Sequence, residues 1–269
     1  MKTYSGKTAL VTGASSGIGK AIAADLAARG AHLILVARSG DRLEALASEL
    51  RAARGGKVEV IVSDLSQPDA PQRLFDAVVE RGLAIDLLVN NAGFGKWGHF
   101  LDDTVATYAE MEALNIGAVV ALCHLFLPSM AARRDCGILN VGSTASFIPV
   151  PWSAVYGATK AFVLSFSEAL GYEYKDRGVQ VTVLCPGNTE SNFARVANDK
   201  ASESPGQSDS PEWVAKVGLD ALLAGKATVI PGLANQQAAI LPRLLPRSTA
   251  LNLVGGVWRK RLLARGVKV

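Results

Sequence analysis

Tyr156, Lys160 and Ser143 are the residues of this chain whose types and spacing best suit proton-transfer chemistry. Tyr156 and Lys160 stand four residues apart in Y-G-A-T-K, so on a helix their side chains share one face. An ammonium group beside a phenol can lower its pKa and prepare it to exchange a proton during carbonyl chemistry. The pair by itself fits a solvated helix face equally well, and Ser143 could merely cap a strand end.

A glycine-rich turn, T-G-A-S-S-G-I-G, follows the first apolar run of the sequence. Glycines let the backbone approach a pyrophosphate, and the free N–H groups that open the next helix favour its negative charge. A tight strand-to-helix connection is the alternative interpretation. The context favours a dinucleotide site, to which the turn would contribute Gly13, Ser15, Ser16, Gly17, Ile18 and Gly19.

Arg38 decides the expected choice of dinucleotide. It follows the second apolar run in L-V-A-R-S, where an acidic residue would otherwise bond a ribose 2′-hydroxyl. An arginine suits a 2′-phosphate, so NADP (NADPH) is favoured over NAD, with Arg42 able to assist. A surface cation is the alternative. Asp64, followed by Leu65, could accept a hydrogen bond from the adenine amino group, or it could cap a helix.

Short apolar runs alternate with longer segments of helical period, which is typical of a parallel sheet covered by helices on both faces. The pattern predicts strands over 8–11, 32–37, 57–62, 87–90, 137–141, 179–185 and 227–230. It predicts helices over 17–29, 41–53, 69–81, 103–133, 153–177 and 211–223. The expected fold is therefore α/β, a Rossmann-type doubly wound sheet of seven parallel strands flanked by helices, with ligands beyond the carboxyl ends of the strands.

The organisation expected of the 269 residues is one catalytic domain over 1–232 and an extension over 233–269. Residues 196–210 are polar, lie beside the expected cleft and could form a lid over it or a surface loop. Charges interrupt the apolar stretches, and the N-terminus lacks the pattern of a signal peptide, so a cytoplasmic protein without membrane spans is expected. The three cysteines have no metal-like spacing and are expected to be buried thiols.

The net charge of +4 is unevenly distributed along the chain. Seven cations and no acid lie between residues 231 and 269, which leaves a net charge of −3 on residues 1–230. The body gives no indication of nucleic-acid binding. The basic and apolar extension could pack on the domain, extend a subunit interface or lie on an anionic membrane surface, and packing on the domain or on a partner subunit is favoured over the membrane.

Several motifs together resemble the short-chain dehydrogenase/reductase family from Lys7 to about Gly232. The glycine-rich turn, N-N-A-G, Asn115 in A-L-N-I-G, V-G-S-T-A-S, Y-G-A-T-K and the P-G dipeptide stand in the family's order and spacing. The runs N-A-G-F-G and V-I-P-G-L-A-N look most similar to a bacterial branch related to hydroxysteroid and long-chain 3-oxoacyl reductases.

The resemblance implies a role for each member of a catalytic tetrad. Tyr156 would be the general acid in reduction and the general base in oxidation. Lys160 would lower the phenol pKa, helped by the positive nicotinamide, and bond the nicotinamide ribose. Ser143 would hold the substrate oxygen, and the Asn115 backbone would position a water. A strand-end cap for Ser143 and a kinked helix at Asn115 remain the structural alternatives.

Further cofactor contacts follow from the same resemblance. Gly93 would lie close to the cofactor, whereas Asn90 and Asn91 are expected to tie neighbouring strands together. Pro186 and Gly187 would approach the nicotinamide, and Thr189 and Ser191 would share a phosphate or carboxamide contact. The backbone contacts of the N-N-A-G segment are assigned to Asn91, Ala92 and Gly93.

The function expected is an NADP-dependent oxidoreductase acting on a hydrophobic small-molecule carbonyl or alcohol; the alternative is a non-catalytic NADP-binding protein for regulation or assembly. Apolar residues indicate the hydrophobic substrate, and His99 is expected to be a loop hydrogen-bonder. A homodimer or homotetramer is expected through the two long helices. The residues expected near the cleft are Phe94, Trp97, Phe147, Pro149, Pro151, Trp152 and Phe193, and those expected to pair subunits include Val119, Leu122, Phe162 and Phe166.

Overall fold

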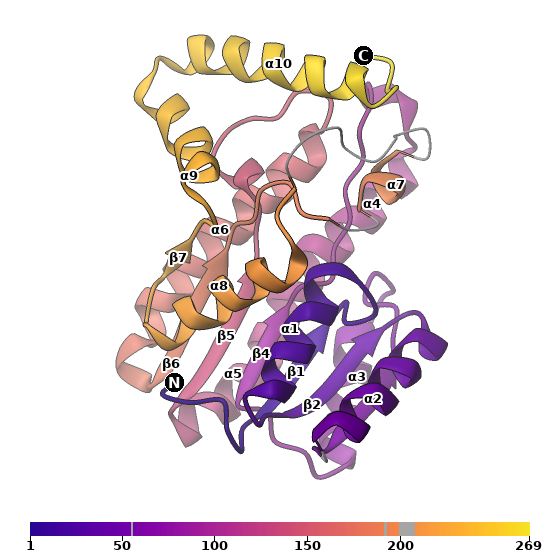
Figure 1. The fold of residues 1–269 in the computed structure, drawn as a ribbon, viewed down its shortest axis with the longest axis vertical. Helices are drawn as coiled ribbons and strands as arrows, with labels where there is room; N and C mark the ends of the chain where they lie inside the picture. Colours follow the sequence, from indigo (N-terminus) through magenta and orange to yellow (C-terminus); the bar gives the residue numbers. More distant parts are fainter. Residues whose placement is uncertain (55, 191–192, 199–207) are drawn as a thin grey trace.

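Seven parallel strands form a sheet with the order β3-β2-β1-β4-β5-β6-β7 (Figure 1). The computed structural model describes residues 1–54, 56–190, 193–198 and 208–269. The strands are β1 (Thr8–Thr12), β2 (His32–Ala37), β3 (Val58–Val62), β4 (Leu87–Asn90), β5 (Cys136–Val141), β6 (Val179–Leu184) and β7 (Thr228–Val229). The predicted doubly wound fold with seven strands is confirmed, and the strand limits differ from the prediction by no more than one residue at either end.

Burial on both faces explains why the strands read as almost continuous apolar runs. Every residue of β4 and β5 is buried, and so is every residue of β1 after Thr8. Parallel sheets bury both faces because the crossover helices pack on each side. β1 lies between β2 and β4, and its Leu10 is in register with Ile34 of β2 and with Leu88 of β4.

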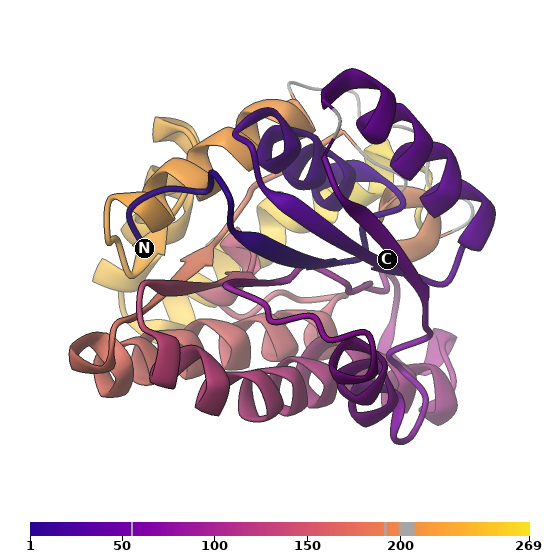
Figure 2. The same cartoon turned by 90° about the horizontal axis from the view of Figure 1, so that it is seen from below.

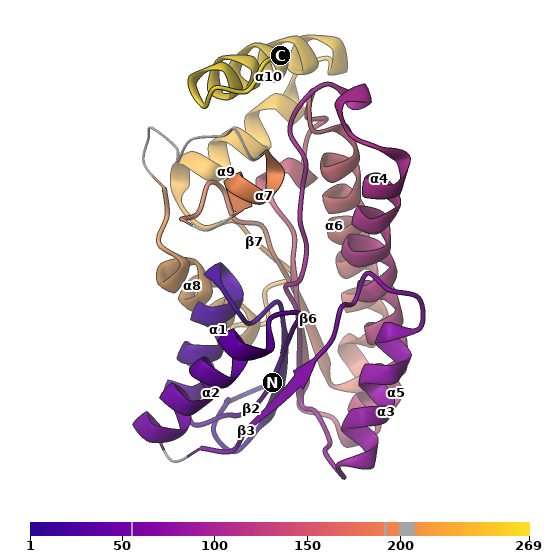
Figure 3. The same cartoon turned by 90° about the vertical axis from the view of Figure 1, so that its right-hand side faces the viewer.

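Two layers of helices enclose the sheet, as Figures 2 and 3 show. One layer holds α1 (Gly17–Ala28), α2 (Gly40–Arg54) and α8 (Pro211–Leu223). The other holds α3 (Ala70–Glu80), α4 (Val105–Glu112), α5 (Ala118–Arg133) and α6 (Ala154–Tyr174), the last followed by a 3-10 turn, η4 (Lys175–Arg177). The predicted start of α8 is confirmed in detail, because Ser210 Oγ accepts a hydrogen bond from Trp213 N and Pro211 follows the cap.

α4 and α5 form one rod that is interrupted by a π-helical turn, η2 (Ala113–Gly117), where Ala118 N donates to Ala113 O. The whole segment, Val105–Arg133, is long and apolar enough to span a membrane by length and composition. Charges therefore interrupt this segment less than expected, and the expected lack of membrane spans stays a prediction. In the fold this segment belongs to the same helix layer as α3 and α6, and Val119 and Leu122 of α5 are buried in the core.

Polar side chains at the core of the sheet connect β4, β5 and α6. Asn90 Nδ2 donates to Asn140 Oδ1 at 2.9 Å, and Asn140 Nδ2 donates to Ser167 Oγ at 2.9 Å. Asn140 and Ser167 are buried completely or almost completely. Burial in a low-dielectric interior makes such bonds valuable, because an unpaired amide there would lose its hydration without compensation.

The extension after β7 forms α9 (Leu233–Ile240), a 3-10 turn η5 (Leu241–Leu244) and α10 (Arg247–Ala264). A short helix that the sequence did not indicate, α7 (Phe193–Ala197), begins before the segment that was expected to be a loop or lid. Ala197 is 1% exposed and packs with Trp97 and Leu262, so the segment that was expected to be a polar loop or lid joins the core at this residue. The lid interpretation rests mainly on 199–207, outside the described residues.

Asn140 offers a test of the buried polar chain. Asn140→Leu is expected to lower the free energy of unfolding by about 1–3 kcal/mol, because the Asn90 amide loses an acceptor inside the core. Urea denaturation measures the change. Asn252→Leu, on the exposed side of α10, is the matched control and should leave stability within about 0.5 kcal/mol of the original. Equal stabilities for the two variants would contradict the importance of the buried chain.

Candidate active site

The turn between β1 and α1 has the geometry that a pyrophosphate needs. Gly13 and Gly17 have φ angles of 65° and 53°, in the left-handed region that favours glycine. A Cβ on Gly19 would lie 2.3 Å from Gly13 O, so only glycine allows the turn to close this tightly. Ser16 precedes α1 without a side-chain capping bond and the first turn has no acid, which leaves the first N–H groups of α1 available to an anion. These residues fit a nicotinamide dinucleotide.

Thr12 and Asn91 hold the ends of β1 and β4 together below this turn. Thr12 Oγ1 accepts hydrogen bonds from Asn91 N and Ala92 N, both at 3.0 Å. Asn91 Nδ2 returns a bond to Thr12 O at 2.9 Å. The structure therefore shows the strand-tying role expected of Asn91, and it adds Thr12, which sequence reasoning had treated only as the start of a motif. Gly93 lies beyond them and is exposed.

Arg38 and Asp64 follow β2 and β3 at the carboxyl edge of the sheet. Arg38 is 62% exposed and its Nη1 lies 3.6 Å from Glu110 Oε1. Asp64 Oδ1 accepts hydrogen bonds from Ser66 N and Ser66 Oγ. Burial would raise the pKa of Asp64, but these bonds and the Arg38 charge outweigh it, so the pKa is lowered. Asp64 thus holds its turn, and its contact with adenine stays a prediction. Leu65 is a core residue, which leaves its backbone to meet a ligand.

α6 presents Tyr156 and Lys160 on one face, and the loop after β5 brings Ser143 to them. Lys160 Nζ lies 5.9 Å from the centre of the Tyr156 ring and donates to Val141 O at 2.8 Å. Ser143 lies close enough to Tyr156 to act on its pKa, and its Oγ accepts from Ala145 N at 3.1 Å, which caps the 3-10 turn η3 (Thr144–Ser146). The predicted trio is therefore brought together, and Ser143 has the capping role that the sequence left as the alternative. Its role in holding the substrate oxygen stays a prediction.

Burial dominates the protonation of this trio. It raises the pKa of Tyr156 to about 12, against the hydrogen bond from Ser143, which acts to lower it. It lowers the pKa of Lys160 to about 8. Loss of hydration thus outweighs the other influences on the phenol in the protein without cofactor. The lowering expected from Lys160 together with the positive nicotinamide stays a prediction. Tyr156 is a neutral phenol at pH 7, which is the form that donates a proton.

Asn115 connects the loop after β4 to α6. Its Oδ1 accepts from Phe94 N at 3.1 Å, and its Nδ2 donates to Phe94 O and to Thr159 Oγ1 at 2.9 and 3.0 Å. Asn115 is fully buried in the middle of the π turn η2. The irregular helix that the sequence left as the structural alternative is present, and the side chain has a positioning role that was not expected. The water held by the Asn115 backbone stays a prediction.

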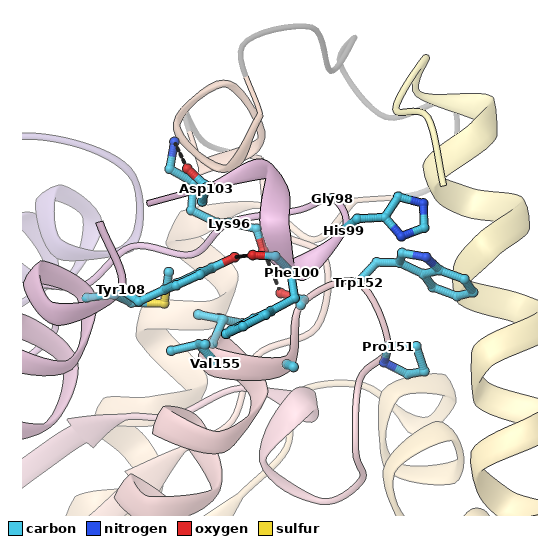
Figure 4. A pocket seen from close by; sticks show the side chains of 13 residues that line it. Lys96, Gly98, His99, Phe100, Asp103, Tyr108, Pro151, Trp152 and Val155 are labelled. Atoms are coloured by element: carbon cyan, nitrogen blue, oxygen red, sulfur yellow. Dashed lines mark hydrogen bonds and ion pairs between the residues drawn. The ribbon is translucent and has the colours of Figure 1, made fainter. Parts of the chain in front are cut away.

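A cavity of about 230 Å³ opens beside Tyr156 (Figure 4). Its walls come from the loop after β4, from α4 and from the loop before α6. Pro151 and Trp152 line it as expected, and His99 lines it too, while its backbone N–H donates to Asp102 Oδ2. Lining residues that the sequence did not single out include Lys96, Phe100, Tyr108 and Met111. They lie outside the recognised motifs, so only the fold could bring them together.

Aromatic residues pack on the other side of Tyr156. The Phe193 ring lies 5.3 Å from the Tyr156 ring, and a Cβ on Gly95 would meet both rings at 2.8 Å. Trp97 is only 6% exposed and packs with the extension rather than lining the cleft, which corrects its expected role. Phe94 is also buried, and Phe147 packs beside α6 with the Arg243 guanidinium 5.8 Å from its ring.

The extension reaches the segment after β6 that is expected to approach the nicotinamide. Pro186 O accepts a hydrogen bond from Thr144 N, and a Cβ on Gly187 would lie 2.2 Å from Asn235 Oδ1 of α9. Arg265 stacks 4.6 Å from the Trp97 ring centre and donates to Asn188 Oδ1. Thr189 pairs with Asp209, and Ser191 lies outside the described residues.

Two of the residues expected to pair subunits do not face outward. Val119 and Leu122 are 6% and 1% exposed and pack in the core beneath α5. Phe166 is half-buried against the same core, and its ring stacks 5.8 Å from that of Phe162. Phe162, which is 39% exposed, is the member of this set that reaches the surface most.

The comparisons with known proteins agree with this geometry. The short chain dehydrogenase family model matches residues 7–202. Mouse (Mus musculus) 17-beta-hydroxysteroid dehydrogenase type 3 is 35% identical over 204 residues, which cover 74% of this chain but 65% of the relative, just under two thirds of its length. Very-long-chain 3-oxoacyl-CoA reductase of Anas platyrhynchos is 33% identical and covers 98% of this chain and 83% of its own.

A solved short-chain dehydrogenase from Sphingobium yanoikuyae, in complex with NADPH, has a TM-score of 0.80. It is 32% identical and covers 88% of this chain and 93% of its own. Complexes with NAD and with NADP also occur among the similar structures.

The buried ammonium of Lys160 predicts a particular dependence of stability on pH. Its pKa is about 8 when folded and 10.5 when free, so the unfolded chain binds the proton more tightly. Burial of the charge therefore opposes folding fully below pH 8, and this cost disappears as the pH rises toward 10.5. Lys160→Met removes the cost. Without cofactor the variant should be more stable at pH 7 by on the order of 2–3 kcal/mol, and the difference should shrink between pH 8 and 10.

Chemical denaturation of the two proteins across this pH range measures the difference. Groups that titrate in both proteins cancel when one curve is subtracted from the other. A difference that stays constant from pH 7 to 10 would contradict the buried charge.

Proposed function

This chain belongs to the short-chain dehydrogenase family, and from that premise we propose that it is an NADP(H)-dependent oxidoreductase of hydrophobic ketones and secondary alcohols. The observation that carries the proposal is the position of Tyr156, a half-buried phenol that is neutral at pH 7 and lies beside Ser143 and Lys160. A proton donor and a hydroxyl beside a cavity are the groups that reduction of a carbonyl to an alcohol requires.

In the proposed reaction Ser143 and Tyr156 hold the substrate oxygen between their hydroxyl groups. NADPH, when bound, supplies the hydride that adds to the carbonyl carbon. Tyr156 then donates its proton to the oxygen, and Ser143 stabilises the negative charge while it develops. Lys160 lies close enough to stabilise the phenolate that remains, and Asn115 keeps the loop after β4 in register with α6. Oxidation of an alcohol uses the same groups in reverse.

The burial of Lys160 favours catalysis over the alternative of a non-catalytic NADP-binding protein. An ammonium group that is 6% exposed and has a lowered pKa destabilises the fold. A protein that only binds the dinucleotide has no need to keep this buried charge beside a phenol that borders a cavity. Perturbed groups that lie together at a cavity are typical of sites that move protons.

The apolar walls of the site support the proposed substrate class. Pro151, Trp152 and Met111 line the cavity, and Phe193 packs on the Tyr156 ring. The two curated relatives are named for a hydroxysteroid and for a very-long-chain 3-oxoacyl-CoA, which carry a hydroxyl or oxo group on a large apolar body. A ketone or secondary alcohol on a hydrophobic skeleton matches both observations.

Tyr156→Phe tests the proton-transfer role. Turnover of a hydrophobic ketone is expected to fall by about 100-fold to 10,000-fold, because the proton donor is lost, while NADPH binding is kept. The assay follows NADPH absorbance, and fluorescence titration gives the Kd. Tyr108→Phe is the matched control, since Tyr108 lines the same cavity but donates its hydroxyl to Phe100 O. Full turnover by the Tyr156 variant would refute the proposed role.

Arg38→Asp tests the cofactor preference. The guanidinium is exposed after β2, where we propose that a 2′-phosphate binds, so the variant should bind NADPH about 10 to 100 times more weakly while its affinity for NADH changes little. Arg177→Asp, at the opposite edge of the sheet, is the control for a change of charge. Isothermal titration with each cofactor gives the affinities. Equal affinities for NADPH and NADH in the unmodified protein would rule out the proposed preference.

A further inference from the structure

The extension exposes an unusual number of large aliphatic side chains. Leu233 and Leu244 are 72% and 76% exposed, and Leu253 on α10 is 55% exposed. We use the name C-terminal surface for the exposed side chains of residues 233–269. Its large apolar members are Leu233, Ile240, Leu241, Leu244, Leu245, Leu251, Leu253, Val257 and Leu263. They make up half of the eighteen exposed large hydrophobic side chains in the described part of the chain, whereas single exposed apolar residues are ordinary.

Contacts of α10 with the body of the protein determine which of its residues face the solvent. Ala250, Gly255 and Leu262 are buried, and Leu262 belongs to the cluster with Trp97. Leu253, Val257 and Lys260 follow one another at four and three residues, and all three are exposed. This spacing places them on one side of the helix, opposite Gly255 and Leu262, whereas Ala250 in the first turn is buried on the same side as they are. α10 lies at one end of the molecule (Figure 1). There it exposes Leu253 and Val257 to the solvent next to Lys260.

The same surface carries only positive charge. Residues 231–269 contain seven cations and no acid, and of these cations Arg265 is buried while Arg243, Arg247, Arg259, Lys260, Arg261 and Lys268 are exposed. Arg259 and Arg261 flank Lys260 on the outer part of α10. Aliphatic side chains among lysines and arginines match the chemistry of a bilayer surface, where anionic headgroups lie above acyl chains.

Charge also argues against a second copy of the chain as the occupant. Two C-terminal surfaces placed face to face would bring their exposed cations together without a single carboxylate side chain between them. Protein interfaces also favour exposed aromatic anchors, and the aromatic residue of the extension, Trp258, is partly buried against Trp97 at 6.0 Å. Leucine and valine need no fixed partner in acyl chains.

We propose that the C-terminal surface docks peripherally on bilayers that contain anionic lipid. The exposed leucines enter the boundary between headgroups and acyl chains, and the cations bind the lipid phosphates and carboxylates. The surface is separate from the tetrad on α6 and its neighbours, so the inference does not depend on the proposed enzymatic activity.

Co-sedimentation of the full chain with vesicles tests the proposal. Vesicles of phosphatidylcholine with phosphatidylserine are compared with vesicles of phosphatidylcholine alone. Binding is expected to the anionic vesicles, and it should weaken as the salt concentration rises. Replacement of two cations, Arg259→Gln with Lys260→Gln, is expected to reduce the partition coefficient by about 30-fold. The double variant Leu244→Ser with Leu253→Ser should reduce the partition coefficient by about 10-fold or more, because its two leucine side chains no longer enter the bilayer.

Two control variants carry the same chemical changes elsewhere on the molecule. Val79→Ser alters an aliphatic side chain on α3 that is 54% exposed, and Arg177→Gln removes a cation next to α6. Both should bind vesicles as the original protein does, and thermal melting confirms that every variant is folded. The proposal is overturned if the protein does not bind anionic vesicles, or if the paired variants bind as well as the controls. It is also overturned if those variants only dissociate a dimer, or only release an acidic protein partner, with vesicle binding unchanged.

Discussion

The site depends on the place where the chain segments that follow β1 and β4 diverge. The two strands are paired neighbours, but their following segments go to opposite faces of the sheet. The chain leaves β1 for α1 in one layer and leaves β4 for α4 in the other. The gap that opens between them is where ligands bind in doubly wound sheets. Thr12 and Asn91 bridge the gap through backbone and side-chain hydrogen bonds. The glycine-rich turn and the loop that leads to Asn115 both begin at these two residues, so their geometry follows from this bridge.

A second constraint is the loss of hydration at α6. Tyr156 and Lys160 both favour their neutral forms because the fold removes them from water. The phenol of Tyr156 therefore keeps its proton. The ammonium group of Lys160 loses its proton more readily than in water, and it donates a hydrogen bond to Val141 O. A small change in the surrounding charge can shift either group, which suits a site that must give up and recover a proton in each cycle.

The sequence predicted the parts of this structure that depend on local pattern. Continuous apolar runs located all seven strands, and the motif order assembled Ser143, Tyr156 and Lys160 correctly because each motif occupies the end of a defined element. The contacts of Asn235 and Arg265 could not be predicted, since they join residues 48 and 77 positions apart in the chain. The raised pKa of Tyr156 was missed for a related reason: burial comes from the whole fold, whereas the spacing to Lys160 shows only the attraction between the two groups.

Helix periodicity also could not distinguish the sides of α5 and α6. Apolar residues occur all around these helices, so Val119 and Leu122 were assigned to the surface although they pack in the core. α7 contains five residues, too few for a helical period to be recognised.

The π turn in the rod of α4 and α5 has the geometry of a one-residue insertion in an otherwise regular helix. Each residue turns a helix by about 100°, so α5 has its present rotation about its own axis only because that additional residue is there. Shortening the turn by one residue would restore a uniform helix. It would also rotate Val119, Leu122 and Phe126 away from the sheet relative to α4. The rod can therefore neither gain nor lose a residue without rotating α5 relative to α4. Insertions or deletions between Thr104 and Arg133 should be far rarer among functional variants of this chain than substitutions.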